Sequence, residues 1–209
     1  YRVTPVQYLQ TCRLLLAKRL LTDTDLPVTE VALAAGFQSL RRFNALFQSC
    51  YRMAPTELRK RRKAPAETAG QVTLELRYRP PYRWEALLAF LEQRAIPGVE
   101  KVEEGAYLRT VGLKSGESLH TGWLKVAHVP EREALSVTVS ASLLPVLPQV
   151  LSRVRHLFDL YCEPETIYEA LKGMTELHPD LCRPGTRLPG CFDPFEMSVR
   201  AVLGQQITV

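Results

Sequence analysis

A glycine between two short helical segments constrains the fold of this chain more than any other feature. The first segment opens at Pro27 or the residue after it, and Gly36 follows its last turn. A glycine just past a helix can adopt the left-handed conformation that turns the chain sharply. Ser39 then suits the N-cap of a second helix. Two short helices joined in this way predict a helix-turn-helix unit within residues 27–63.

The second of these helices carries two kinds of side chain. Phe43 and Phe47 are four residues apart and share the face that packs on the first helix. A recognition helix presents polar side chains to base edges, so the candidate DNA contacts are Gln38, Ser39, Arg41, Arg42 and Asn44. A last helix restarts at Pro55 and runs into residues expected to contact phosphates, namely Lys60, Arg61, Arg62 and Lys63. The alternative for the two arginines of the second helix is a solvated helix face.

The basic charge of the chain is concentrated at one end. Residues 1–63 hold 12 Lys and Arg against 4 Asp and Glu, whereas residues 64–209 hold 15 against 18. The first segment therefore carries a formal charge of +8 and the second a charge of −3. A basic domain is the electrostatic footprint of nucleic-acid binding, so we expect double-stranded DNA as a partner. The alternative is a soluble surface whose charge is merely uneven.

Hydrophobic periodicity divides the rest of the chain into helices and strands. A long helix is predicted over residues 6–21, and a linker without long apolar residues over residues 64–71. Strands are predicted over residues 72–78, 106–114, 120–128 and 134–141. Helices are predicted over residues 84–95, 146–161, 164–177 and 194–203. This order of elements indicates an α+β unit with an antiparallel sheet.

Residues 1–8 and 51–58 form an internal repeat. Identical residues recur at an offset of 50, as Tyr1, Arg2 and Pro5 in the first copy and Tyr51, Arg52 and Pro55 in the second. The second copy follows the predicted recognition helix, so another helix-turn-helix is expected upstream of the first copy. Because the chain begins with Tyr rather than Met, residue 1 is not expected to be the true start.

Composition argues against several other classes of protein. No run of 18 apolar residues occurs, which excludes a membrane-spanning helix, and the first residues lack the order of a secretory signal. No Cys-x-x-Cys pair and no histidine at ligand spacing occurs, so we expect no metal site, no cofactor and reduced thiols in a cytoplasmic protein. The thiols concerned are Cys12, Cys50, Cys162, Cys182 and Cys191.

The first 63 residues resemble a known family of regulators. Residues 28–32 (Val-Thr-Glu-Val-Ala) and 36–37 (Gly-Phe), with the two aromatic residues and the proline named above, look like the second helix-turn-helix of AraC-type regulators. Residues 14–21 fit the helix that links the two halves of such a domain. The resemblance implies RNA polymerase as a further partner of this regulator half. Arg52 departs from the pattern, because the family usually has Gly there and a left-handed turn strains other residues.

The second half is similar to bacterial alkyladenine DNA glycosylases of the AlkA type. The matching segments follow one another in order, and the last 25 residues are the most specific. They are residues 80–84 (Pro-Pro-Tyr-Arg-Trp), 90–91, 94–95, 157–160 (Leu-Phe-Asp-Leu), 187–196 (Arg-Leu-Pro-Gly-Cys-Phe-Asp-Pro-Phe-Glu) and 199–206 (Val-Arg-Ala-Val-Leu-Gly-Gln-Gln). In bacteria such a glycosylase occurs fused behind an Ada-type alkylation-response regulator, and the whole chain resembles that fusion.

This second resemblance implies roles for particular residues. Gln206, after Gln205, matches the wedge that enters the duplex when a damaged nucleotide is flipped out. Phe90 matches a residue of the aromatic pocket for the cationic alkylated base, and its alternative is a core aromatic of an amphipathic helix. Trp84 is expected in the core, Asp159 in a structural role and Asp193 at a helix start. No residue matches the aspartate that stabilises the transition state, which is expected downstream of residue 209. The zinc-bound, methyl-accepting cysteines are expected upstream of residue 1.

The combined reading is a multidomain chain. It comprises an all-α helix-turn-helix domain (1–63), a linker (64–71), an α+β antiparallel-sheet (TBP-like) domain (72–184) and the first helix of an all-α helix-hairpin-helix glycosylase domain (185–209). The resemblance implies a bacterial, cytoplasmic protein that regulates transcription and hydrolyses the N-glycosidic bond of alkylated purines. The 209 residues alone are expected to bind DNA weakly and to release no base. The alternative is a non-enzymatic AraC-type regulator with an α+β domain that binds an effector or partner.

Overall fold

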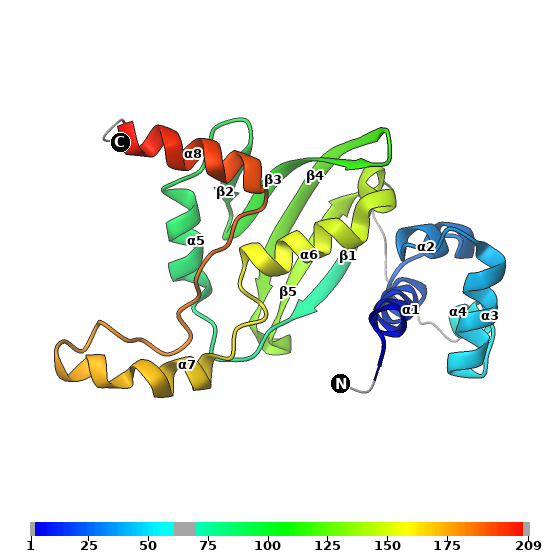
Figure 1. The fold of residues 1–209 in the computed structure, drawn as a ribbon, viewed down its shortest axis with the longest axis horizontal. Helices are drawn as coiled ribbons and strands as arrows, with labels where there is room; N and C mark the ends of the chain where they lie inside the picture. Colours follow the sequence, from blue (N-terminus) through cyan, green and yellow to red (C-terminus); the bar gives the residue numbers. More distant parts are fainter. Residues whose placement is uncertain (1–2, 61–69, 207–209) are drawn as a thin grey trace. The chain divides into compact units, whose positions relative to one another are not determined.

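The computed structural model describes residues 3–60 and 70–206 (Figure 1). Four helices come first: α1 (Pro5–Asp23), α2 (Val28–Ala34), α3 (Leu40–Tyr51) and α4 (Pro55–Lys60). The strands are β1 (Gln71–Arg77), β2 (Glu100–Glu103), β3 (Ala106–Ser115), β4 (Ser118–Val129) and β5 (Ala134–Ser140). The later helices are α5 (Trp84–Glu92), α6 (Leu147–Leu157), α7 (Pro164–Leu171) and α8 (Pro194–Gln206), with 3₁₀ turns η1 (Pro130–Arg132), η2 (Ala141–Val146) and η3 (Lys172–Glu176).

The described residues fall into two compact units. The first lies within Tyr1–Leu74, Arg109–Lys125 and Val137–Pro148. The second lies within Glu75–Leu108, Val126–Ser136 and Gln149–Val209. No helix in the described part of the chain is both long enough and apolar enough to cross a membrane.

The helix-turn-helix of the first unit forms as its sequence predicts. Helix α1 begins with a capping box, in which Thr4 and Gln7 each bond the other's backbone N–H. Gly36 has a φ of 88° and turns the chain between α2 and α3, and the Ser39 side chain accepts a hydrogen bond from the N–H at the start of α3. Arg52 ends α3 at a φ of 56°, so the left-handed turn is kept although the residue is not glycine.

The five strands form one antiparallel sheet with the order β1-β5-β4-β3-β2. Strand β1 alternates as expected, because Val72, Leu74 and Leu76 are buried between more exposed residues. On its other face, the Thr73 and Thr138 hydroxyls hydrogen-bond across β1 and β5 at 2.9 Å. The predicted antiparallel sheet is therefore confirmed.

The core of the second unit is built around an aromatic cluster. Trp84 opens α5 and is 3% exposed, and its ring stacks on that of Phe158 with the centroids 5.5 Å apart. Tyr107 of β3 meets Phe158 edge-on at 5.6 Å. The Trp84 indole N–H donates to the Gly105 carbonyl at 3.1 Å, which satisfies its polar atom. The core position predicted for Trp84 is confirmed.

Local structure differs from the prediction at three places. Strand β2 was not predicted, because Glu-Lys-Val-Glu lacks apolar alternation and the segment pairs only as the last strand beside β3. The helix predicted over residues 146–161 starts within one residue of α6 but is shorter: α6 covers Leu147–Leu157, and Asp159 has a left-handed φ of 50°. The helix predicted over residues 164–177 ends at Leu171 and continues as the 3₁₀ turn η3.

Candidate nucleic-acid interface

One face of α3 carries the predicted base-contacting residues. Arg41 and Asn44 are three residues apart on a single helix face, and both are exposed. Gln48, which is not one of the predicted contacts, continues this face and is also exposed. Gln38, Ser39 and Arg42 are also exposed at the N-terminal end of the helix. The same polar segment therefore remains accessible to a ligand such as the edge of a base pair.

The opposite face of α3 is held by a chain of aromatic rings. Phe43 and Phe47 are fully buried, with ring centroids 5.5 Å apart. Phe37, from the turn, lies 5.1 Å from Phe43, and Tyr51 lies 4.7 Å from Phe47. Because both ends of the helix join this cluster, aromatic packing supports α3 behind its polar face along the length of the helix.

Three exposed basic residues of the helical region are available for an anionic partner. Arg41 and Arg42 form no ion pair among the described residues, and Lys60 is exposed at the end of α4. Unpaired guanidinium groups in this position can bond phosphates or guanine. The other predicted phosphate contacts, Arg61, Arg62 and Lys63, lie outside the described residues.

Phe90 lies on the solvent side of α5 and is 40% exposed. The alternative that it is a core aromatic was therefore wrong, because Trp84, Leu87, Leu88 and Leu91 form the buried face of this helix. The Arg94 guanidinium lies over the Phe90 ring, 3.9 Å from its centroid. One face of this aromatic ring is thus already occupied by a cation.

The start of α8 is fixed by Asp193. The backbone N–H groups of Phe195 and Glu196 donate to Asp193 Oδ1 at 2.9 and 3.1 Å, which confirms the predicted helix-start role. The Arg153 guanidinium donates to Asp193 Oδ2 at 3.0 Å and to the Phe192 carbonyl at 3.0 Å. The Glu196 N–H and the Arg153 guanidinium hold the pKa of the Asp193 carboxyl below its usual value.

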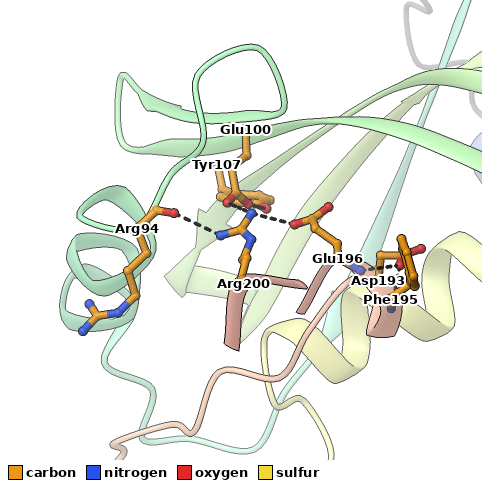
Figure 2. A network of polar contacts seen from close by, with 7 residues as sticks. All are labelled: Arg94, Glu100, Tyr107, Asp193, Phe195, Glu196 and Arg200. Atoms are coloured by element: carbon orange, nitrogen blue, oxygen red, sulfur yellow. Dashed lines mark hydrogen bonds and ion pairs between the residues drawn. The ribbon is translucent and has the colours of Figure 1, made fainter. Parts of the chain in front are cut away.

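Arg200, about two turns further along α8 than Asp193, is the centre of a polar network (Figure 2). Its Nη1 donates to the Arg94 carbonyl at 3.0 Å, and its Nη2 donates to Glu100 Oε1 and Glu196 Oε1, both at 2.6 Å. The Tyr107 hydroxyl donates to the other oxygen of Glu100. Helix α8 is therefore joined to the segment after α5 and to the sheet (Figure 1).

The predicted wedge residues lie at the far end of α8. Gln205 is exposed, and Gln206 is the last residue of the helix, with a side chain that lies outside the described part of the chain. Sequence reasoning missed Arg94, Glu100 and Arg200, since these residues meet only in the folded chain. Arg200 lies in the segment 199–206 that resembles the glycosylases. Nothing in that segment indicated its partners Arg94 and Glu100, which are about 100 positions away in the sequence.

The segment before α8 is also tied to the body of the second unit. Arg187 is 5% exposed and donates to the carbonyls of Arg79 and Pro81. The Leu188 N–H donates to the Asp159 carboxylate at 3.2 Å, which fits the structural role predicted for Asp159. Among the described residues, no group of three or more His, Cys, Asp or Glu could hold a metal ion.

Comparison with known proteins assigns both parts of the chain. Residues 73–193 match the AlkA N-terminal domain, and residues 1–61 match a helix-turn-helix domain. The chain is 35% identical over 209 residues to a Mycobacterium tuberculosis protein named "Probable bifunctional transcriptional activator/DNA repair enzyme AlkA", covering 98% of this chain and 41% of that protein.

Two further relatives each match one part. DNA-3-methyladenine glycosylase 2 of Escherichia coli is 38% identical over 134 residues, which is 64% of this chain and 44% of the glycosylase. The HTH-type transcriptional activator RhaS of an Enterobacter species is 39% identical over 62 residues, which is 30% of this chain and 22% of the activator. The chain spans less than half of the length of each of these relatives. Because the AlkA model covers more than half of its residues, the chain belongs to the AlkA N-terminal domain family, with a helix-turn-helix domain ahead of that domain.

Proposed function

We propose that this chain is part of a bifunctional protein of the DNA alkylation-damage response. The helix-turn-helix binds double-stranded DNA to regulate transcription, and the intact protein hydrolyses the N-glycosidic bond of alkylated purines such as 3-methyladenine. The observation that carries this proposal is the order of the two domains, which one bifunctional relative shares along 98% of this chain.

The surface of α3 supports the regulatory half of the proposal. Arg41, Arg42 and Asn44 are exposed side chains of the types that bond guanine and adenine in the major groove. The buried aromatic cluster behind them keeps the helix rigid, which direct readout of base edges requires. Lys60 and the three basic residues after it would contact phosphates, which position the helix without specifying sequence. RNA polymerase is the further partner proposed for this half.

The second unit supports the repair half. Phe90 offers an exposed aromatic face, and a cationic alkylated purine is attracted to such a face. Gln205 and Gln206 are the last residues of α8, and we assign to them the wedge that fills the gap left by a flipped nucleotide. The domain boundaries proposed for these roles are 1–63, 64–71, 72–184 and 185–209. The proposed setting is the bacterial cytoplasm, and no cofactor is assigned to the reaction.

The test is release of base from methylated duplex DNA. The intact protein should release 3-methyladenine, whereas the 209-residue chain alone should release none, because no residue in it is assigned to the transition state. A duplex-binding assay on the same chain should show weak binding that Arg41→Ala and Arg42→Ala weaken further, with Arg132→Gln as control. An intact protein that binds duplex DNA but releases no alkylated base would overturn the repair half and favour a regulator without enzymatic activity.

A further inference from the structure

Helix α8 packs little apolar surface against the other described residues of the second unit. None of residues 194–205 is buried among them, and five apolar side chains are between 42% and 79% exposed: Phe195, Met197, Val199, Val202 and Leu203. Among the described residues, polar side chains join α8 to the rest of the second unit.

Those polar contacts are made at two points. At the first turn, Asp193 caps the helix and accepts a hydrogen bond from Arg153 of α6. The second point is Arg200, about two turns further on, which bonds the Arg94 carbonyl and the Glu100 carboxylate. Two separated attachment points define the direction of a helix axis, and Figure 2 shows the contacts of the second one, at Arg200.

We propose that Arg200 is the positioning residue that holds Gln205 and Gln206 in a fixed place relative to Phe90. This inference rests on the proposed function of these three residues. Arg200 stands five positions before Gln205 on the same helix, and it bonds the backbone of Arg94. The Arg94 side chain in turn lies over the Phe90 ring. One arginine thus links the helix of the wedge to the residue that covers the pocket aromatic.

The chemistry of the network requires an arginine. The guanidinium has donors on separate nitrogens, and here Nη1 and Nη2 bond acceptors from different segments at the same time. The Glu100 side chain is only 6% exposed, and its second oxygen accepts a hydrogen bond from the Tyr107 hydroxyl. Glu100 therefore has a fixing contact that does not depend on Arg200. A lysine ammonium would keep the charge beside Glu100, but its single nitrogen is a point charge without the planar fork.

Arg200 matters for catalysis because the wedge and the base pocket must act on the same nucleotide. The wedge has to enter the duplex at the nucleotide whose base occupies the pocket. A displacement of about 1 Å at a site remote from the chemistry can lower a rate on the order of 100-fold. Loss of Arg200 should therefore affect the rate of excision more than the affinity for duplex DNA.

The experiment compares Arg200→Gln and Arg200→Lys in the intact protein, with Arg132→Gln as a matched control. Arg132 is an exposed arginine that pairs with Glu75, and neither residue is a partner of Arg200. Amide hydrogen exchange of residues 194–206 measures the attachment of α8. Single-turnover release of 3-methyladenine measures excision, and thermal unfolding measures whether each variant is folded.

For Arg200→Gln we expect exchange in α8 to become about tenfold faster, since a hydrogen bond to a charged group contributes enough stability for a change of about that size. Excision should slow by about 10- to 100-fold with little change in the dissociation constant for duplex DNA. Arg200→Lys should give intermediate values of both, and Arg132→Gln should match the unchanged protein. If Arg200→Gln alone unfolds the protein, Arg200→Lys carries the comparison.

The outcomes separate this inference from the proposed function. An active protein in which folded Arg200 variants leave exchange in α8 and excision unchanged overturns the positioning role. The role is likewise overturned if excision falls only in proportion to DNA affinity. If the unchanged protein releases no base, the proposed function fails, and faster exchange confined to residues 194–206 in the variants still supports the attachment of α8 by Arg200.

Discussion

The left-handed residue at the end of α3 allows a prediction whose sign is unusual for a substitution to glycine. Arg52 has a φ of 56° and a ψ of 24°, and its N–H donates to the Gln48 carbonyl at 2.9 Å. A non-glycine residue in this conformation costs about 1–2 kcal/mol, which glycine avoids. Arg52→Gly keeps the backbone hydrogen bond, so the substitution should relieve this strain.

The net magnitude follows from two opposing effects. Glycine gains conformational freedom in the unfolded chain, which offsets about 0.5–1 kcal/mol of the relief. The Arg52 side chain is exposed and forms no ion pair among the described residues, so its removal should sacrifice little else. We therefore expect Arg52→Gly to stabilise the helix-turn-helix by about 0.5–1 kcal/mol.

Amide hydrogen exchange of residues 40–51 is the suitable assay, because it reports on α3 separately from the second unit. Exchange should slow by about two- to fivefold in Arg52→Gly, which corresponds to the expected stabilisation. Gln48→Gly, an exposed position inside the same helix, is the matched control and should destabilise α3 by about 1 kcal/mol. Faster exchange in Arg52→Gly would refute the reasoning, since it would mean that strain at this turn is negligible.

Three further predictions concern other parts of the chain. Phe43→Ala should destabilise the helix-turn-helix by about 3–5 kcal/mol, because a fully buried ring is removed. Urea unfolding followed by helical circular dichroism should therefore have a lower midpoint in the variant than in the unchanged protein. Arg94→Gln should uncover the Phe90 ring and tighten binding of methylated duplex by about two- to fivefold, as an exposed cation–π contact is worth about 0.5–1 kcal/mol; weaker binding in a titration would contradict it. Burial lowers the pKa of His128, which stacks on Trp84, so the folded state binds the proton more weakly than the unfolded state. The contribution of His128 to the free energy of unfolding should be constant above about pH 6.5 and should fall as the pH drops below that value. Denaturant unfolding of His128→Gln should lack this pH dependence.

Local interactions explain why much of the fold could be predicted from sequence. The cap at Ser39, the turn at Gly36 and the aromatic pair Phe43 and Phe47 each depend on residues within four positions of one another. Strands such as β1 were recognisable because side chains alternate between the two faces of a sheet. The departure at Arg52 was also visible, although only the structure decided that the chain keeps the left-handed turn there.

The candidate site was less predictable, because its defining contacts join residues far apart in the chain. Strand β2 has no apolar alternation, and pairing with β3 makes it a strand. Phe90 has the spacing of an amphipathic helix, yet its exposure depends on what the rest of the fold places beside α5. By itself the sequence determined the two domain types and their order, and it supplied candidates for the DNA contacts. Only the tertiary structure decided that Arg200 meets Glu100 and the Arg94 backbone, because these contacts follow from packing between segments that no local pattern relates.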